Sequence, residues 1–248
     1  MFVKTKQHTQ EDIILNTMNK KKITILSGAG LDAESGVATL RDSNGLWENH
    51  KVEDVASPKG WLTNPEMVLE FYNQRRRQLT EVEPNEAHKQ LVRLEEKYDV
   101  YHITQNVPDL LERAGARKVL HLHGQLTQAK SSGNESNVKN IGYEDIKLGD
   151  LCEEGFQMRP NIVWFGESVP MILTAEGLAY DSDIFIIIGT SLVVYPAAGL
   201  VGKTEPDTPI YVIDPNDTPL FGRKGFVTFI KKSATEGVKE LVDQLMAD

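Results

Sequence analysis

The chain contains a single cysteine, Cys152, among its 248 residues. One thiol excludes an intramolecular disulfide and any site that needs two or more protein thiolates. The sequence also has no apolar run close to the roughly 20 residues of a membrane-spanning helix, and its Lys- and Gln-rich start lacks the apolar segment of a signal peptide. These absences favour a cytoplasmic protein with no membrane partner.

Positive charge is also scarce. Lys and Arg total 27 against 36 Asp and Glu, for a formal net charge of −9. This excess of acid argues against nucleic acid as a general partner. The length suits one large domain with or without a small insert, and the sequence leaves the oligomeric state open.

Five short, almost continuously apolar segments each end where small or polar residues begin. Such runs are typical of parallel strands covered by helices on both faces. Ligands bind at the carboxyl ends of strands in open parallel sheets. We therefore expect an α/β fold, a Rossmann-like parallel sheet with helices on both faces, whose strands are 23–26, 98–103, 119–122, 184–188 and 210–213.

Helical patterns lie between these strands. Asn64 and Pro65 form a start signal, an N-cap followed by proline at the first helical position, for a helix to about residue 79. Further helices are expected over 85–96 and from 233 to the C-terminus.

The polar segment 128–157 interrupts this alternation. A structureless loop of that length is uncommon in a compact domain, so we predict a small, weakly packed second lobe formed by insertions. We expect one catalytic domain, 1–248, with a large lobe over approximately 14–44, 80–127 and 158–248, and a small lobe over approximately 45–79 and 128–157.

A glycine-rich segment follows the first expected strand. Gly28, Gly30 and Ala33 fit the G-x-G-x-x-G/A pattern, in which glycines allow a tight turn and close approach of a pyrophosphate to a helix N-terminus. The pattern favours nucleotide binding over a plain tight turn. An ordinary dehydrogenase would place an acid at the end of a second strand about 20 residues later. Glu48 has that spacing but follows no strand, so that class is not expected.

Two histidines lie in the segment Leu120-His121-Leu122-His123-Gly124. An imidazole at the end of an apolar strand can act as a base near neutral pH, and His123 has that position. His121 points to the same face one layer deeper, where a structural role is the expectation.

The glycine-rich segment 28–36, continued by Thr39, Arg41 and Gly45-Leu46-Trp47, resembles the cofactor loop of the sirtuins, the NAD-dependent protein deacylases. The resemblance runs from about residue 21 to the C-terminus. It implies a Rossmann-like domain and a smaller lobe, with NAD and an acyl-lysine protein meeting between them. The further motifs, in the family's order, are Thr104-Gln105-Asn106-Val107, Glu112-Arg113-Ala114-Gly115, His123-Gly124, Arg159-Pro160, Val163-Trp164-Phe165-Gly166-Glu167 and Gly189-Thr190-Ser191.

The resemblance implies an enzyme that releases nicotinamide from NAD and transfers the acyl group, giving free lysine and O-acyl-ADP-ribose. It implies catalytic roles for His123, as general base on the ribose hydroxyls, and for Asn106. The cofactor-binding residues it implies are Gly28, Ala29, Gly30, Ala33, Glu34, Thr39, Arg41, Trp47, Gln105, Asn106, Val107, Pro108, Gly189, Thr190, Ser191, Asp214, Pro215, Asn216 and Ala234.

Two segments bear on the substrate. Tyr72 and Arg75 share one helix face, and a hydroxyl with a guanidinium suits a carboxylate. In sirtuins that remove succinyl and malonyl groups a Tyr-x-x-Arg pair occupies this place, which implies a desuccinylase or demalonylase with deacetylation also open. The alternative is a solvated basic face, with Tyr72 in the core. By the same resemblance Val163, Phe165, Gly166 and Glu167 pair with an extended substrate peptide; the alternative is an internal strand.

Three departures from the family pattern stand out. Most sirtuins hold the small lobe with a four-cysteine zinc site, which one cysteine cannot form, so we predict no metal. Pro108 stands where the family has an aspartate that binds the nicotinamide carboxamide, and Leu40 replaces a phenylalanine beside the reacting ribose. These changes leave two alternatives open: an ADP-ribosyltransferase or NAD hydrolase, and a catalytically weak NAD-binding sensor.

Overall fold

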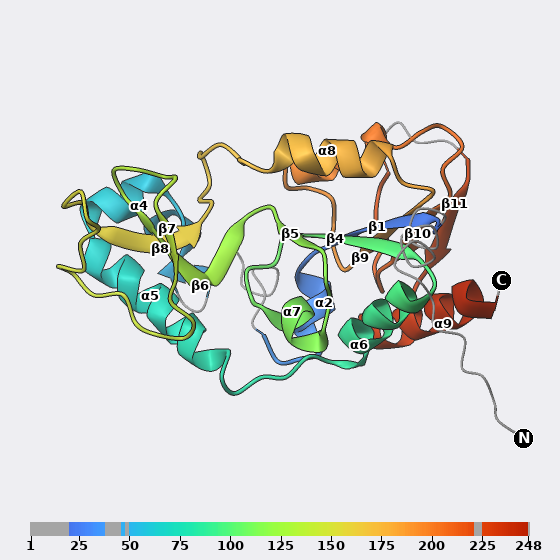
Figure 1. The fold of residues 1–248 in the computed structure, drawn as a ribbon, viewed down its shortest axis with the longest axis horizontal. Coiled ribbons are helices and arrows are strands. Elements are labelled where there is room, and N and C mark those ends of the chain that lie inside the picture. The colour runs from blue at the N-terminus through green and yellow to red at the C-terminus, as the bar shows by residue number, and fades with distance from the viewer. Residues whose placement is uncertain (1–19, 38–45, 48–49, 221–224, 248) are drawn as a thin grey trace, which may run out of the picture.

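The large lobe is built on a six-stranded parallel sheet of strand order β11-β10-β9-β1-β4-β5 (Figure 1). The computed structural model describes residues 20–37, 46–47, 50–220 and 225–247. The expected fold class is confirmed, as are the expected strands. The strands of this sheet are β1 (Lys22–Ser27), β4 (Asp99–Thr104), β5 (Val119–His121), β9 (Ile184–Ile188), β10 (Ile210–Ile213) and β11 (Val227–Ile230).

The edge strand β11 has no counterpart among the sequence-based expectations. Its two central residues are both exposed, Phe229 by half, so the strand lacks the continuous burial of the expected strands. Among the described strands its partner is β10, where Ile210 lies opposite Val227. A half-covered edge strand carries too weak a periodicity to be recognised from the sequence.

Helices cover both faces of this sheet. On one face α6 (Glu86–Arg93) and α9 (Ala234–Ala247) bury Leu91 and Leu241 against Ile23. On the other face lie α8 (Ile172–Tyr180) and the 3₁₀ segment η3 (Ala197–Lys203). Figure 1 shows α8 above the sheet and the pair α6 and α9 below it. Shorter helices are α2 (Ala29–Ala33), η2 (Leu94–Glu96) and α7 (Leu110–Ala114).

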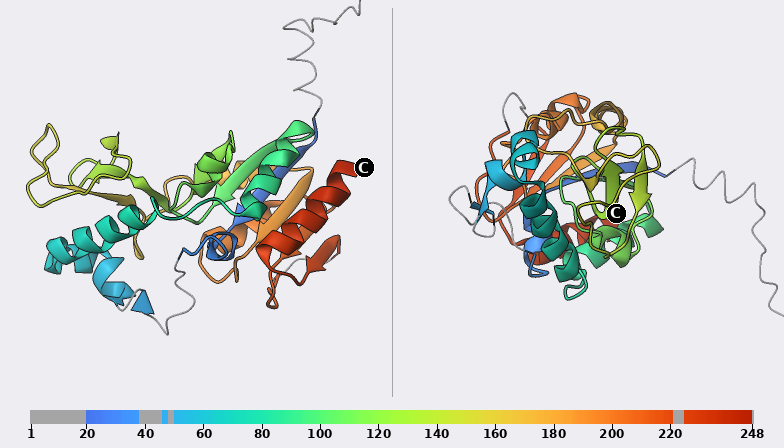
Figure 2. Two further views of the ribbon diagram at one scale, coloured as in Figure 1. Left: turned by 90° about the horizontal axis from the view of Figure 1, so that it is seen from below. Right: turned by 90° about the vertical axis from the view of Figure 1, so that its left-hand side faces the viewer.

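The small lobe projects from one end of the large one, as Figure 1 and the left view of Figure 2 show. Its sheet is antiparallel, in the order β7-β6-β8, and begins at Gly124 and ends at Ile162. It therefore takes in residues on both sides of the polar segment 128–157. Its elements are β2 (Leu46–Trp47), β3 (His50–Lys51), α3 (Val52–Val55), α4 (Pro58–Thr63), α5 (Pro65–Gln78), β6 (Gly124–Ser131), β7 (Val138–Asn140) and β8 (Met158–Ile162).

The start of α5 follows the predicted signal. The Asn64 side chain accepts a hydrogen bond from the Met67 backbone N–H, and Pro65 occupies the first helical position. In the part of the chain that the structure describes, no helix is long and apolar enough to cross a membrane.

Candidate functional site

A cavity of about 400 Å³ lies where the carboxyl ends of β1, β4 and β9 meet the small lobe. Residues of both lobes line it, including Gly28 and Gly189 from the large lobe and Trp47 and Tyr72 from the small lobe. The predicted site residues brought together here are Gly28, Ala29, Trp47, Tyr72, Gln105, Asn106, Val107, Pro108, His123, Val163, Phe165, Gly166, Glu167, Gly189, Thr190 and Ser191.

The glycine-rich segment packs tightly against the end of β9. Gly28 N–H donates to the Ile188 carbonyl and Gly30 N–H to the Gly189 carbonyl, both at 2.9 Å. A Cβ atom on Gly28 would lie 2.7 Å from the Thr190 Cβ, and one on Gly30 only 2.6 Å from the Gly189 Cα. The glycines are therefore required by contact within the chain itself, in addition to any approach of a phosphate.

Two amide side chains tie the end of β4 to the neighbouring strands. Gln105 donates from Nε2 to the Thr190 hydroxyl at 3.1 Å. Asn106 donates from Nδ2 to the Gly28 carbonyl at 2.9 Å, and its backbone N–H donates to the Thr104 hydroxyl. These bonds hold both predicted residues at the cavity wall.

His123 is held in one tautomer. Its Nδ1 lies 3.2 Å from the Gln105 carbonyl oxygen, which can only accept, so Nδ1 carries a proton and Nε2 keeps its lone pair. Burial lowers the pKa of His123 below 6.5, and the bond to the Gln105 carbonyl opposes this only in part. The ring is therefore a neutral base at pH 7.

The backbone conformation and surroundings of position 124 explain why a glycine follows this histidine. Its φ is +84°, and a Cβ there would lie 1.9 Å from the Asn161 carbonyl oxygen on β8. The left-handed turn carries the chain from β5 into β6 directly after His123. No other residue type fits this position.

His121 has a different environment. Its Nδ1 lies 3.0 Å from the Asn106 carbonyl oxygen, and its Nε2 lies 2.7 Å from Oε1 of Glu112. Both ring nitrogens are thus occupied by groups of the protein. This agrees with the structural role expected for His121, since it braces the turn that presents Asn106.

The Tyr72 and Arg75 pair lies in α5 and is buried. The Tyr72 hydroxyl accepts a hydrogen bond from Trp164 Nε1 at 3.1 Å, and burial raises its pKa, so the phenol keeps its proton. The Arg75 guanidinium lies 3.6 Å above the Phe71 ring and donates to the Phe71 carbonyl. As far as the structure describes the lining, the cavity includes Tyr72 but not Arg75.

The alternative of a solvated basic face is wrong for Arg75 and Arg76, which are 8% and 0% exposed. It is right for Arg77, whose half-exposed side chain pairs with Glu70 and Asp145.

The segment 163–167 forms a turn after β8. Val163 N–H donates to the His123 carbonyl and Phe165 N–H to the Ala56 carbonyl, so these two groups are already paired within the chain. The Glu167 carboxylate accepts from Arg159 and from the Trp164 N–H. The Phe165 side chain is half exposed at the cavity.

Sequence reasoning missed several lining residues. Val193 and Tyr195, each about two-thirds exposed, line the cavity together with Val194 and Pro196. Their signal was an apolar run directly after the strand-end residues Gly189-Thr190-Ser191. Asp32 was also missed because it lies inside the glycine motif at a variable position.

Other predicted cofactor residues lie elsewhere. The Glu34 carboxylate accepts from the backbone N–H and the hydroxyl of Thr235, and so caps the start of α9, where Ala234 also lies. Asp214, Pro215 and Asn216 follow β10, and Asp214 accepts from the Asn216 N–H at 2.9 Å. Ala33 ends α2. Thr39, Leu40 and Arg41 lie outside the described residues.

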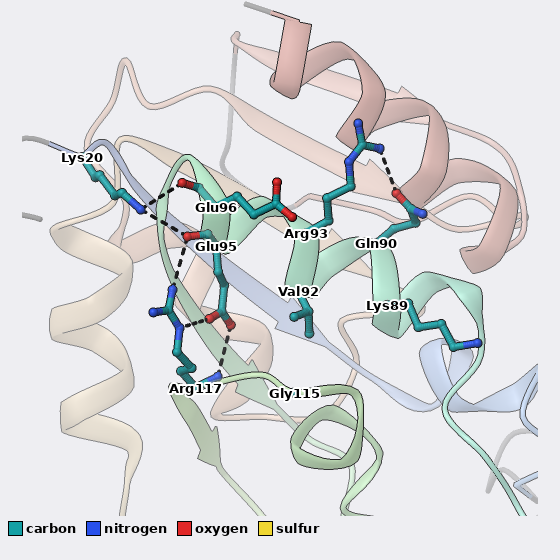
Figure 3. A pocket seen from close by; sticks show the side chains of 9 residues that line it. All are labelled: Lys20, Lys89, Gln90, Val92, Arg93, Glu95, Glu96, Gly115 and Arg117. Carbon is teal, nitrogen blue, oxygen red and sulfur yellow. Dashed lines mark hydrogen bonds and ion pairs between the residues drawn. The ribbon is translucent and has the colours of Figure 1, made fainter. Parts of the chain in front are cut away.

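A second hollow lies on the large lobe beside η2, lined among others by Lys20, Arg93 and Arg117 (Figure 3). These three cations are already paired within the protein, Arg93 with Asp243. Arg117 donates from Nε to Glu95 Oε2 at 2.5 Å, and Lys20 donates to the backbone carbonyls of Glu95 and Glu96. This hollow is a set of structural ion pairs.

Comparison with known proteins gives consistent matches. A family model described as "Sir2 family" matches residues 28–196. An NAD-dependent protein deacylase of Helicobacter pylori is 50% identical over 226 residues, covering 91% of this chain and 98% of the relative. One of Bacteroides thetaiotaomicron is 46% identical over 231 residues, with the same coverage. A solved Sir2 homologue in complex with NAD is 34% identical, with a TM-score of 0.81, covering 97% of this chain and 95% of that one.

Proposed function

The chain belongs to the Sir2 family of NAD-dependent protein deacylases, and we propose that it prefers acidic acyl groups, such as succinyl and malonyl, on lysine. The products are nicotinamide, O-acyl-ADP-ribose and free lysine. We further propose that the enzyme works in the cytoplasm on acyl-lysine proteins.

One observation carries the deacylase assignment within this chain. His123 presents an unprotonated Nε2 in a cavity lined by the ends of β1, β4 and β9. NAD is the second substrate: the acyl oxygen of the modified lysine bonds to the ribose carbon of NAD as the bond from that carbon to nicotinamide breaks. His123 then accepts a proton from a ribose hydroxyl, so that the hydroxyl oxygen can attack the acyl carbon. Asn106 also lines the cavity: its side chain donates to the Gly28 carbonyl, and its own carbonyl oxygen contacts His121.

The acyl preference is supported by the chemistry of α5. Tyr72 places a protonated phenol at the cavity, and Arg75 places a buried cation on the same helix face. A carboxylate at the end of the acyl chain would accept charge-assisted hydrogen bonds from that cation, and such bonds are stronger than neutral ones. An acetyl group needs neither residue.

The test compares peptides that differ only in the acyl group. Succinyl-, malonyl- and acetyl-lysine peptides are incubated with and without NAD, and acyl loss is followed by mass spectrometry. Replacing Arg75 by Met should lower kcat/KM for desuccinylation about 30-fold or more and leave deacetylation within about threefold. Arg77→Met, on the exposed side of the same helix, should change neither.

Two outcomes would contradict the proposal. Equal losses of desuccinylation and deacetylation in Arg75→Met would remove the carboxylate role. NAD consumption without any acyl peptide, or ADP-ribose on protein, would instead favour an NAD hydrolase or ADP-ribosyltransferase.

We also propose that the small lobe holds together without zinc. Cys152 is buried and lies 3.4 Å from the Ser131 hydroxyl. Asn73 of α5 bonds both backbone groups of Ile146, and Arg76 donates to the Leu126 carbonyl at 2.6 Å. These bonds join α5 to the small sheet and to the segment after β7. Stoichiometric zinc in a metal analysis of the purified protein would contradict this.

A further inference from the structure

We propose that Asp32 is the carboxylate that receives the nicotinamide group of NAD in the cavity, and that His88 positions it. The inference rests on the proposed use of NAD and concerns a residue that the sequence motifs did not single out.

Asp32 lies in α2 and lines the cavity, as do Asn106, Val107 and Pro108. It is only 4% exposed. Its neighbour Leu31 belongs to the same core cluster as Leu111, which follows Pro108 in the first turn of α7. The turn at Pro108 and the helix carrying Asp32 therefore line the same cavity.

The side chain of His88, in α6, is hydrogen-bonded to the Asp32 carboxylate. Its ring is fully buried in α6, and its Nε2 lies 3.0 Å from Asp32 Oδ1. Its Nδ1 accepts from the Asn85 backbone N–H at 3.2 Å, as part of the helix cap, and so cannot carry a proton. The proton is on Nε2 and is donated to Asp32.

This arrangement leaves Asp32 with a negative charge to offer. A neutral imidazole orients the carboxylate without neutralising it. Within the part of the chain that the structure describes, His88 is the hydrogen-bond partner of this carboxylate, through Oδ1. Oδ2 is thus the oxygen left for a ligand.

Asp32 and Glu167 are the acids among the described residues that line the cavity. Glu167, also in the lining, is bound by Arg159 and by the Trp164 N–H. Asp109, next to Pro108, is not among the residues that line the cavity: its Oδ2 accepts from the Tyr143 hydroxyl at 2.6 Å, and its Oδ1 is buried without a hydrogen-bond partner among the described residues. Pro108 itself brings neither an acid nor a backbone N–H.

The nicotinamide group of NAD matches this environment. It is a cationic ring that carries a carboxamide, whose NH₂ group must donate hydrogen bonds when it leaves water. Val107 and Pro108 suit the ring, and a buried carboxylate both accepts from the carboxamide and offsets the positive charge. Asp32 therefore supplies the carboxylate that position 108 lacks.

The test measures binding of the nicotinamide group separately from binding of the ADP-ribose part of NAD. Asp32→Asn keeps an oxygen for the His88 N–H but turns an NH₂ group toward the cavity. The nicotinamide concentration that half-inhibits deacylation should rise about tenfold or more, while the Kd for ADP-ribose, which lacks nicotinamide, stays within about twofold. Asp32→Ser also removes the carboxylate but introduces no NH₂ group. Its nicotinamide inhibition should weaken in the same way, and it serves as the second variant if Asp32→Asn does not fold.

Two further variants complete the design. His88→Phe should also weaken nicotinamide inhibition, but add nothing in the presence of Asp32→Asn, because the histidine acts through the carboxylate. Asp99→Asn removes an acid at the opposite end of β4, where it pairs with Lys118, and should leave nicotinamide inhibition unchanged.

Unchanged nicotinamide inhibition in both Asp32 variants would overturn the proposal, and so would an equal loss of ADP-ribose affinity. Failure of the proposed acyl preference would look different, since it alters the ratio between peptides and not the response to nicotinamide. If the wild-type protein deacylated no peptide, calorimetry of NAD against ADP-ribose would still decide the role of Asp32.

Discussion

The carbonyl oxygen of Gln105 lies 3.2 Å from Nδ1 of His123, and this contact decides which ring nitrogen can act as a base. The two residues come from adjacent parallel strands, since Gln105 follows β4 and His123 follows β5. Their pairing leaves Nε2 with a lone pair at the cavity.

The first prediction concerns the pH dependence of the reaction. The base form of His123 is required, and burial lowers its pKa below 6.5. Activity should therefore be constant around neutrality and fall only as the pH drops through that lowered pKa. A profile of kcat/KM between about pH 5 and 8 checks this. A half-activity point above pH 6.5 would contradict it.

Removing the base tests the same residue by mutation. His123→Ala should lower kcat by about 10² to 10⁴, the usual contribution of a general base. Affinity for ADP-ribose, measured by calorimetry, should persist because the glycine-rich segment keeps its own contacts with β9. A variant with near-normal turnover would exclude His123 as the base.

The neighbouring histidine should behave differently. Burial raises the pKa of Glu112, but its hydrogen bond with His121 outweighs burial and lowers the pKa below 4.5, so the Glu112 side chain is ionised. Glu112→Gln should weaken this brace and lower the free energy of unfolding by about 1 kcal/mol, with a loss of kcat well below that of His123→Ala. Urea unfolding and steady-state kinetics distinguish the two effects. A kinetic loss as large as that of His123→Ala would contradict a purely bracing role.

Gly124 offers a test with a matched control. Gly124→Ala meets the Asn161 carbonyl at 1.9 Å and should destabilise the protein by about 3 kcal/mol or more. Gly155→Ala has nearly the same φ, +83°, but meets nothing within 4 Å, so it should cost only about 1 kcal/mol of backbone strain. If urea unfolding showed equal losses of stability in the two variants, the positive φ at Gly124, and not its contact with Asn161, would be the reason for the glycine.

The ion pairs of Figure 3 predict how stability changes with pH. Burial raises the pKa of Glu95, but the nearby His102 ring, whose Nε2 lies 3.4 Å from Oε1, and the hydrogen bonds from Arg117 outweigh it and lower the pKa to about 2. Because the folded-state value is depressed, Glu95 stabilises the fold fully above its ordinary pKa of 4.5, and this contribution is lost as the pH falls from 4.5 to about 2.

Glu95→Gln should accordingly lower the free energy of unfolding at pH 7 by roughly 3 kcal/mol. The difference from wild type should shrink as the pH falls below 4.5. Glu96→Gln, an exposed neighbour, is the control and should have little effect. A difference that stays constant with pH would contradict the assignment.

Several elements could be predicted because their signals are local. The apolar strands β1, β4, β9 and β10 follow from continuous burial in a sheet covered on both faces. The start of α5 follows from Asn64 and Pro65 alone. The edge strand β11 and the pairing of β6 with β8 could not be read in this way, because exposed strands and long-range pairing carry little periodicity.

The sequence by itself determined the α/β fold, the strand-end motifs that meet at the cavity and the family of the chain, since each depends on burial or on neighbouring residues. Only the tertiary structure decided which nitrogen of His123 is left for the cavity. It also decided that Glu34 caps α9 instead of lining the cavity, and that His88 holds Asp32 although 56 residues separate them in the sequence. Those choices depend on hydrogen-bond partners brought together by folding, whose positions no local pattern encodes.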